Sequence, residues 1–188
     1  MSRRLIIGLG NPGDRYRDTR HNLGFRVVER LAERLGGAAP KLECGALVSE
    51  CESDLLLARP QTYMNRSGYS GRCLVERYGL DRDAVLVVYD DTELPLGRLR
   101  LRAKGGPGGH RGMESLIQNL QSERIARLRL GVGVEEGERD EADLADFVLA
   151  PFKESELPAV EELVERAADA CRSWLDEGVE TAMNRHNG

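Results

Sequence analysis

Two positions in the chain carry residue types that general acid–base catalysis uses. His21 lies in a polar stretch behind a short apolar run, and Asp90 comes directly after the most apolar run in the sequence. Histidine is the side chain whose ordinary pKa lets it take up a proton near neutral pH. A neighbouring carboxylate can fix the tautomer of the imidazole and stabilise its protonated form. We therefore predict that His21 acts as a base and that Asp90 orients it.

The nucleophile that this base would activate is predicted to be water. No serine stands in a G-x-S-x-G elbow, and none of the four cysteines lies in a catalytic context. Asn11 and Asn65 supply neutral amides that could orient the water or stabilise a developing oxyanion. A rival interpretation is a magnesium site formed by Asp90, Asp91 and Glu93, but no second carboxylate cluster accompanies them. We therefore predict a reaction without a metal.

A glycine motif follows the first apolar run. Residues 8–13, Gly-Leu-Gly-Asn-Pro-Gly, match the G-x-G-x-x-G pattern of dinucleotide-binding loops. In such loops the helix starts within the glycines, whereas here Pro12 and the polar residues 14–22 postpone the helix to about Leu23. No acidic residue closes a second strand about 20 residues later. The sequence therefore predicts no nicotinamide cofactor, and we expect no other cofactor.

Basic and apolar residues alternate in two further segments, residues 98–104 and 127–130. The alternation places the basic side chains of each predicted strand on one face. The residues predicted to bind phosphate are Arg100, Arg102, Lys104, Arg127 and Arg129. Between the two segments, the glycine-rich residues 105–109 open a helix whose backbone N–H groups could bind an anion. A solvated, charged edge strand would explain the same alternation without a ligand.

Strands and helices alternate along the chain, which is typical of an α/β protein. Strands are predicted at residues 4–9, 46–52, 55–59, 85–89, 98–104 and 127–130, and helices at residues 23–35, 67–78, 113–120 and 155–177. We expect one domain spanning residues 1–188, in which helices flank a twisted, mostly parallel mixed sheet and a hairpin adds antiparallel edges. Sites in such sheets gather at the carboxyl ends of strands, where His21 and Asp90 would meet.

Charge is distributed unevenly along the chain. The net charge of -5 argues, taken alone, against a nucleic-acid partner. However, residues 1–134 hold 22 basic and 16 acidic residues, whereas residues 135–188 hold 5 and 16. Because the local field attracts a ligand, the first segment can present a positive face to phosphate. Residues 135–141 predict an exposed acidic loop.

The cellular compartment is predicted from cysteines and apolar runs. The cysteines form no C-x-x-C pair, which favours four free thiols in a reducing compartment. No apolar run approaches the roughly 20 residues of a membrane-spanning helix. The apolar stretch behind the basic start is too short for a signal peptide. We therefore expect a cytoplasmic protein without a membrane partner.

Six motifs follow one another along the chain. They are Gly-Leu-Gly-Asn-Pro-Gly at 8–13, Thr-Arg-His-Asn at 19–22, Pro-Gln-Thr-Tyr-Met-Asn-Arg-Ser-Gly at 60–68, Asp90 with Leu-Pro-Leu-Gly at 94–97, Gly-Gly-His-Arg-Gly at 108–112 and Arg-Leu-Arg-Leu-Gly-Val-Gly at 127–133. In order and spacing they resemble the bacterial-type peptidyl-tRNA hydrolase family over essentially the whole chain. Six ordered motifs are far more specific than any one of them.

The resemblance implies a metal-free monomer that cleaves the ester between a peptide and the 3′-terminal ribose of tRNA, which recycles tRNA from stalled or aborted translation. His21 corresponds to the general base and Asp90 to the residue that keeps it basic. Asn11 corresponds to the asparagine that discriminates N-blocked peptidyl esters from free aminoacyl esters. The substrate-binding positions implied are Tyr16, Tyr63, Met64, Asn65, His110 and Arg111. The five basic residues predicted to bind phosphate correspond to the surface for the tRNA acceptor stem.

Two positions depart from the family pattern. Arg111 stands where many relatives have asparagine, so a cation replaces an amide that could orient water or peptide. Our hypothesis is that Arg111 contacts a phosphate of the 3′ end or a peptide carbonyl, which an Arg111→Asn variant with unchanged kinetics would contradict. Residues 134–136, Val-Glu-Glu, are acidic where relatives often carry a basic or polar residue. Any phosphate contact from this loop is therefore in doubt.

Two other functions stay open from the sequence. One is an RNA-binding relative without hydrolytic activity, although such a protein would not need His21, Asp90, Asn11 and Asn65 together. The other is an esterase that uses a metal bound by Asp90 and Asp91, which a chelator would inactivate. The peptidyl-tRNA hydrolase interpretation predicts no effect of a chelator.

Overall fold

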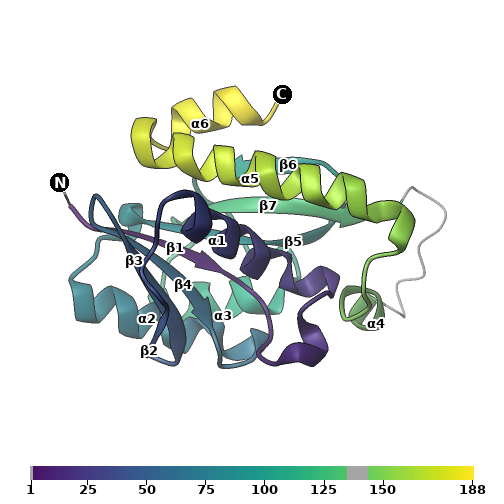
Figure 1. Ribbon diagram of the computed structural model, residues 1–188. Helices are drawn as coiled ribbons and strands as arrows, with labels where there is room; N and C mark the ends of the chain where they lie inside the picture. The colour runs from purple at the N-terminus through teal and green to yellow at the C-terminus, as the bar shows by residue number, and fades with distance from the viewer. Residues whose placement is uncertain (1, 135–143) are drawn as a thin grey trace.

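The computed structural model describes residues 2–134 and 144–188. A seven-stranded sheet with the order β2-β3-β4-β1-β5-β7-β6 forms its centre (Figure 1). The strands are β1 (Arg4–Gly8), β2 (Lys41–Glu43), β3 (Ala46–Cys51), β4 (Leu55–Pro60), β5 (Val85–Pro95), β6 (Leu99–Arg102) and β7 (Ala126–Gly133). The helices are α1 (Leu23–Arg34), α2 (Ser67–Tyr78), α3 (Arg111–Leu120), α4 (Leu144–Val148), α5 (Leu157–Glu177) and α6 (Val179–His186).

The interior of the sheet is parallel and both of its edges are antiparallel. Strands β4, β1, β5 and β7 pair in parallel, whereas β2, β3 and β4 on one side and β6 on the other pair antiparallel. The predicted hairpin is confirmed as β3 and β4, and β6 adds an antiparallel edge on the far side. The predicted α/β class with flanking helices and a mixed sheet is therefore confirmed.

Helices cover the sheet on both faces. Neighbouring residues of a strand point to opposite faces, so Ile6 and Leu86 pack under α1, α5 and α6, while Leu5 and Val85 pack with α2 and α3. All four side chains have no exposed surface. Burial on both faces explains why the parallel strands are continuous apolar runs in the sequence.

Two glycines let α1 press against the carboxyl ends of β1 and β5. A Cβ atom on Gly8 would lie 2.3 Å from the carbonyl oxygen of Gly24, and one on Gly24 would lie 2.3 Å from that of Val88. Only glycine permits so close an approach of backbone to backbone. This contact brings the residues before α1, including His21, to the place where Asp90 follows the apolar part of β5.

The prediction of four free thiols is wrong for two of the cysteines. Cys44, in the turn after β2, forms a disulfide with Cys73 of α2, whereas Cys51 and Cys171 are free. The hairpin of β3 and β4 returns the chain to this turn, where the N–H of Gln61 donates to the carbonyl oxygen of Gly45. The thiols therefore no longer support a reducing compartment.

Among the described strands and α-helices, three short elements were not predicted: β2, α4 and α6. His186 belongs to α6, and its Nε2 lies 2.8 Å from the hydroxyl oxygen of Ser173. The predicted acidic loop at 135–141 lies outside the described residues. Within the described part of the chain, the helices are all too short or too polar to cross a bilayer.

Candidate active site

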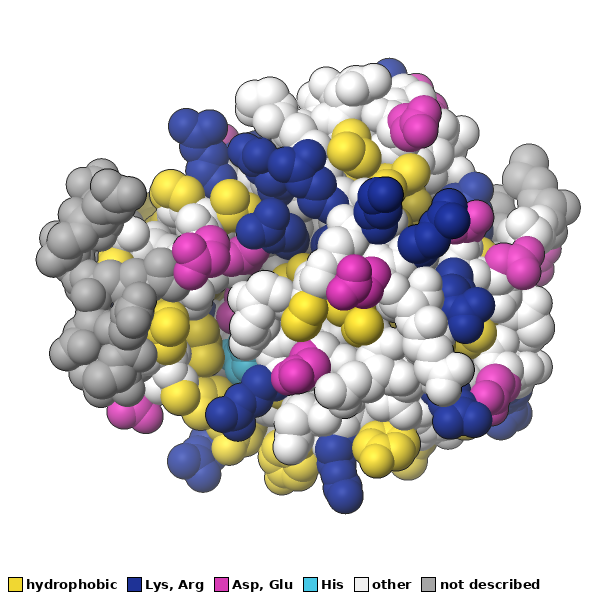
Figure 2. All heavy atoms as spheres, turned by 180° about the vertical axis from the view of Figure 1, so that it is seen from behind, with side chains coloured by type: hydrophobic (Ala, Val, Ile, Leu, Met, Phe, Trp, Pro, Cys, Tyr) yellow, Lys and Arg dark blue, Asp and Glu magenta, His cyan; other side chains and the backbone are white. Residues whose placement is uncertain are grey.

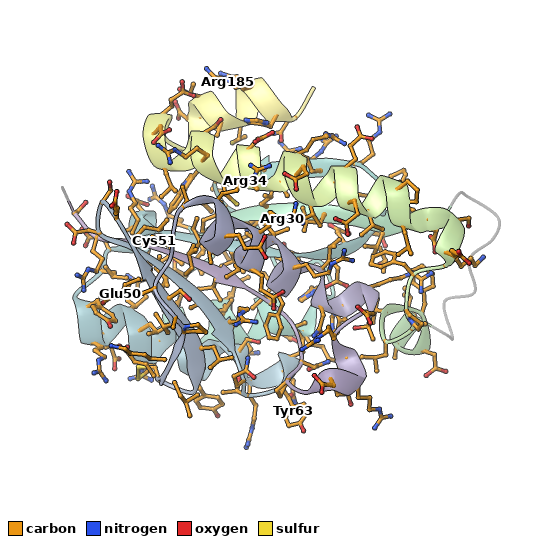
Figure 3. All side chains as sticks on the ribbon, in the orientation of Figure 1. Arg30, Arg34, Glu50, Cys51, Tyr63 and Arg185 are labelled. Atoms are coloured by element: carbon orange, nitrogen blue, oxygen red, sulfur yellow. A yellow bond between two sulfur atoms is a disulfide. The ribbon has the colours of Figure 1, made fainter. Side chains whose placement is uncertain are left out.

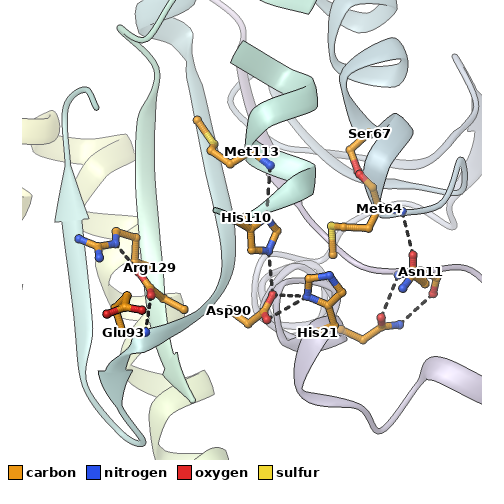
Figure 4. Close-up of polar contacts among 11 residues, drawn as sticks. Asn11, His21, Met64, Ser67, Asp90, Glu93, His110, Met113 and Arg129 are labelled. Carbon is orange, nitrogen blue, oxygen red and sulfur yellow. Dashed lines mark hydrogen bonds and ion pairs between the residues drawn. The ribbon is translucent and has the colours of Figure 1, made fainter. Parts of the chain in front are cut away.

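The carboxylate of Asp90 lies between two imidazole rings at the end of the apolar part of β5 (Figure 4). Nδ1 of His21 lies 2.9 Å from each of its oxygens, and Nε2 of His110 lies 3.0 Å from Oδ1. The Asp90 side chain is 1% exposed, and that of His21 is 13% exposed. His21 comes from the short 3-10 helix Arg20–Asn22, and His110 immediately precedes α3. The predicted meeting of His21 and Asp90 is therefore present.

Hydrogen-bond partners fix the tautomers of both rings. Nδ1 of His110 accepts the backbone N–H of Met113 at 3.2 Å, so the ring proton is on Nε2, which donates to Asp90. An ionised carboxylate can only accept, so Nδ1 of His21 must donate to it. In this tautomer of the neutral ring, Nε2 of His21 carries no proton and can serve as a base.

The charge of Asp90 at neutral pH follows from the pKa of its carboxyl group. Burial alone would raise the pKa of the carboxyl group. The electrostatic interactions and hydrogen bonds with His21 and His110 have the larger combined effect and hold the pKa well below its usual range. Asp90 is therefore an anion at neutral pH and can stabilise a protonated His21.

Hydrogen bonds with two loops hold Asn11 beside His21 and Asp90. The backbone N–H of Asn11 donates to Oδ1 of Asn22 at 2.8 Å, and Nδ2 of Asn22 donates back to the Asn11 carbonyl at 2.9 Å. Its own Oδ1 accepts the backbone N–H of Met64 at 2.8 Å. The amide oxygen is thus occupied, so Asn11, which lines the cavity, offers the donor Nδ2. The sequence singles out Asn22 only as part of the motif at 19–22, because spacing does not reveal its contact with residue 11.

A cavity of about 1180 Å³ contains the site. The predicted site residues that line it are Asn11, His21, Tyr63, Met64, Asn65, Asp90, Arg102, Lys104, His110, Arg111, Arg127 and Arg129. Two predicted residues, Tyr16 and Arg100, are not part of its lining. Figure 2 shows a histidine on the floor of a hollow, with Lys and Arg side chains gathered beside it. Tyr63 is exposed at its edge and projects away from the sheet (Figure 3).

Arg127 differs in its placement from the other basic residues of the cavity. It is 2% exposed, and its guanidinium group donates to three carbonyl oxygens. These belong to Gly106 at 2.8 Å, Ile125 at 2.9 Å and Glu123 at 3.2 Å. Arg127 therefore holds the glycine-rich segment 105–109 in place. The sequence could not reveal this, because the alternation shows which face a side chain occupies but not what covers it.

The other basic residues of the cavity have different partners. Nε of Arg129 donates to Oδ2 of Asp91 at 2.5 Å. Arg102, Lys104 and Arg111 make no side-chain hydrogen bond or ion pair with the described residues, and Arg111 is exposed. Arg100 contributes to a separate, smaller cavity of about 410 Å³.

Tyr89 is a cavity residue that sequence reasoning missed. Its ring centre lies 4.6 Å from that of His110, and the His110 ring lies 5.0 Å from the His21 ring. Burial raises the pKa of Tyr89, against the opposing charges of Arg127 and Arg129. Its place as the last apolar residue before Asp90 was the signal that could have found it.

The residues suggested as a magnesium site are engaged otherwise. Both oxygens of Asp90 face His21. Asp91 accepts from Arg129 and, through Oδ1, from the backbone N–H of Glu93 at 2.8 Å. His21, Asp90 and His110 do bring three donor atoms within 4.8 Å of one another. Their separations of 2.9 to 3.0 Å are those of hydrogen bonds between the side chains themselves.

The chain matches a family model and several named proteins over nearly its whole length. The family model described as peptidyl-tRNA hydrolase matches residues 5–188. The chain belongs to the peptidyl-tRNA hydrolase family. A relative named peptidyl-tRNA hydrolase from Synechococcus sp. (strain JA-2-3B'a(2-13)) is 48% identical over 192 residues, which cover 100% of this chain and 84% of the relative. Another, from Alkaliphilus metalliredigens (strain QYMF), is 43% identical over 98% of this chain and 99% of its own.

Solved structures agree with this assignment. The crystal structure of peptidyl-tRNA hydrolase from Acinetobacter baumannii matches with a TM-score of 0.91 and 31% identity, over 99% of this chain and 95% of that chain. The resemblance drawn from the six motifs is therefore confirmed, and the fold is that of peptidyl-tRNA hydrolase structures.

Proposed function

We propose that this protein hydrolyses the ester between a peptide and the 3′-terminal ribose of peptidyl-tRNA, and so recycles tRNA from stalled or aborted translation. The observation that carries this proposal is the contact of 2.9 Å between Nδ1 of His21 and the carboxylate of Asp90, which orients the ring so that Nε2 of the neutral imidazole can accept a proton. Membership of the peptidyl-tRNA hydrolase family supplies the substrate.

His21 acts as a base and then as an acid in the proposed reaction. Its Nε2 takes a proton from water as the oxygen attacks the ester carbonyl, and Asp90 stabilises the imidazolium ion that forms. The tetrahedral intermediate then expels the ribose 3′ oxygen, which receives the proton from His21. The products are a free peptide carboxylic acid and tRNA with an intact 3′ hydroxyl group. Because the leaving 3′ oxygen is protonated by His21, no metal is needed to stabilise it as an alkoxide.

Asn11 is proposed to stabilise the oxygen of the tetrahedral intermediate. Because its Oδ1 accepts from Met64, Nδ2 is the atom that remains for substrate, and a donor suits a carbonyl oxygen as it becomes negative. Asn65, exposed in the same cavity, is proposed to bind the peptide. Tyr63 is proposed to stack on a base of the unpaired 3′ end.

Arg102 and Lys104 are proposed as the main phosphate contacts, together with Arg129 and Arg111. The pairing of charges supports this choice. Arg30 and Arg34 of α1, which do not line the cavity, pair with Glu165 of α5 (Figure 3). In contrast, Arg102 and Lys104 have no carboxylate partner among the described residues. Unpaired cations beside a site are available to the phosphates of an acceptor stem. Arg127 is assigned to holding the loop, and Arg100, which lines the separate smaller cavity, is proposed as an outlying phosphate contact.

We further infer a cytoplasmic monomer that works without a metal. All the site groups come from one chain, so no second subunit is needed to complete them. Hydrogen bonds between the side chains engage the carboxylates that a metal would need. Peptidyl-tRNA is a product of translation, so the enzyme is inferred to act in the cytoplasm, where translation takes place.

The experiment that tests this function compares two esters on the same tRNA. The protein is incubated, with EDTA present, with N-acetyl-aminoacyl-tRNA and with unblocked aminoacyl-tRNA. We expect release of the acetylated amino acid only. Binding of the blocked substrate without cleavage would instead indicate an RNA-binding relative, and activity lost to EDTA would indicate a metal-dependent esterase.

A further inference from the structure

Arg20, the residue before His21, is a buried cation that fastens a distant segment of the chain. It is 4% exposed. Its Nη1 donates to three carbonyl oxygens, those of Phe147 at 3.3 Å, Ala150 at 3.3 Å and Pro151 at 2.9 Å. The backbone N–H of Arg20 donates to Ala150 as well, at 3.1 Å. One residue therefore binds the end of α4 and the residues that follow it.

Further contacts fix the position of this guanidinium group. Its central carbon lies 4.2 Å from the ring centre of Phe147 and 5.3 Å from that of Phe152. Its Nη2 pairs with Oε1 of Glu156 at 3.0 Å, and the same oxygen accepts the backbone N–H of Lys153 at 2.8 Å. Such a cage leaves the side chain one position.

The helix α4 depends on such an anchor. With five residues it is too short to be stable alone, because helix nucleation is unfavourable. The last carbonyl oxygens of a helix also lack partners within it, and a cation is favourable at that end. Arg20 supplies both the hydrogen bonds and the charge.

Helix α4 in turn forms one side of the catalytic cavity. Leu144, Ala145, Val148 and the following Leu149 line it, and we refer to these four residues as the apolar wall. His21 lines the same cavity and follows Arg20 directly. Arg20 is therefore the covalent neighbour of the base and, through its side chain, the anchor of the wall.

We infer that Arg20 sets the distance between the apolar wall and His21, and that it thereby determines how strongly the site prefers peptides with apolar side chains near the ester. This inference builds on the proposed function. Arg20 is a positioning residue, because its contacts are with the protein and not with the reacting atoms. The peptide side chain would pack on the wall while its ester lies at Nε2 of His21.

The test compares two substrates that share one tRNA and differ in one side chain: N-acetylleucyl-lysyl-tRNA and N-acetylglycyl-lysyl-tRNA. In the wild type we expect a lower KM for the leucyl substrate. Arg20→Lys keeps the charge but cannot reach all three carbonyl oxygens. It should reduce the leucyl preference in kcat/KM by about tenfold, the low end of what one apolar contact contributes. The glycyl substrate, which has no side chain to pack on the wall, should lose less kcat/KM than the leucyl substrate does.

Two further variants complete the experiment. Glu156→Gln removes the charge partner and keeps the carbonyl contacts, so it should reduce the preference less than Arg20→Lys does. It also serves as the test if Arg20→Lys does not fold. Arg34→Gln, on the outer face of α1, should leave the preference intact. Because the ratio of kcat/KM values does not depend on the fraction of active protein, a purely structural role of Arg20 would leave it unchanged. That result would overturn the inference, whereas failure of the wild type to cleave either substrate would contradict the proposed function itself.

Discussion

Nε2 of His110 lies 3.0 Å from Oδ1 of Asp90, so the carboxylate that orients His21 is itself held by a second imidazole. The resemblance to the family had placed His110 among the substrate-binding residues. Its contacts with Asp90 and with the backbone of Met113 favour a positioning role, in which His110 holds Asp90 toward His21.

Replacing His110 should therefore affect turnover more than binding. We expect His110→Ala to lower kcat by roughly tenfold, the effect of about 1.4 kcal/mol lost from one hydrogen bond to a charged group. KM should change little. Steady-state kinetics with N-acetyl-aminoacyl-tRNA separates the two parameters, and a raised KM with unchanged kcat would restore the substrate-binding role.

The depressed pKa of Asp90 predicts a specific loss of stability in acid. Its pKa in the folded protein lies below the unfolded value of about 3.9. The unfolded chain therefore takes up a proton at a higher pH than the folded chain does. The contribution of Asp90 to stability is present above the unfolded pKa and is lost as the pH falls through the folded one.

Thermal unfolding measured from neutral pH down into this range checks the sign. The Tm of the wild type should fall more steeply with pH below about 4 than that of Asp90→Asn, which has no carboxyl group to titrate there. Parallel curves for the two proteins would show that Asp90 contributes nothing to the acid sensitivity.

Asn11→Asp isolates the donor that we assign to the oxyanion. An aspartate oxygen can still accept from Met64, but the second oxygen replaces a donor with a negative charge. We expect kcat to fall by about 100-fold to 1000-fold, the range for loss of an oxyanion donor, with a nearly unchanged Tm. If Asn11→Asp and Asn11→Ala were both nearly as active as the wild type, the role of Nδ2 would be refuted.

Arg102 and Arg127 should respond in opposite ways to the loss of their charge. Arg102→Gln should raise KM and reduce the slope of log KM against log salt concentration by about one contact. Arg127→Met should leave the slope unchanged but lower the Tm by about 6–12 °C, from about 3 kcal/mol of lost hydrogen bonds. If the Arg127 variant instead reduced the slope of log KM against log salt concentration, Arg127 would be a phosphate-binding residue.

Most of the fold could be predicted because its elements carry strong periodic signals. The helix Ser67–Tyr78 has its predicted bounds, and the apolar run at residues 85–89 lies inside the sheet. Helices α4 and α6, with five and eight residues, are too short to show periodicity. The disulfide between Cys44 and Cys73 joins residues 29 positions apart, and only tertiary packing makes them neighbours.

The candidate site was predicted in its centre and less well in its supports. His21 and Asp90 meet because β1 and β5 are parallel neighbours: His21 follows the end of β1, and Asp90 lies where the apolar part of β5 ends. The roles of Arg20, Asn22 and Arg127 depend on contacts with backbone carbonyl or amide groups. Residue type and spacing do not reveal such contacts, because almost any polar side chain can bind a backbone carbonyl or amide group.

The role of His21 as the base is tested by the rate at which His21→Ala cleaves N-acetyl-aminoacyl-tRNA, in single turnovers with EDTA present. His186→Ala is the matched control, since its imidazole contacts Ser173 away from the cavity. We predict that the His21 variant binds the substrate with unchanged affinity and cleaves it about 100-fold to 10,000-fold more slowly, while the control cleaves at the wild-type rate. Cleavage by His21→Ala at the wild-type rate would contradict the assignment of His21 as the base.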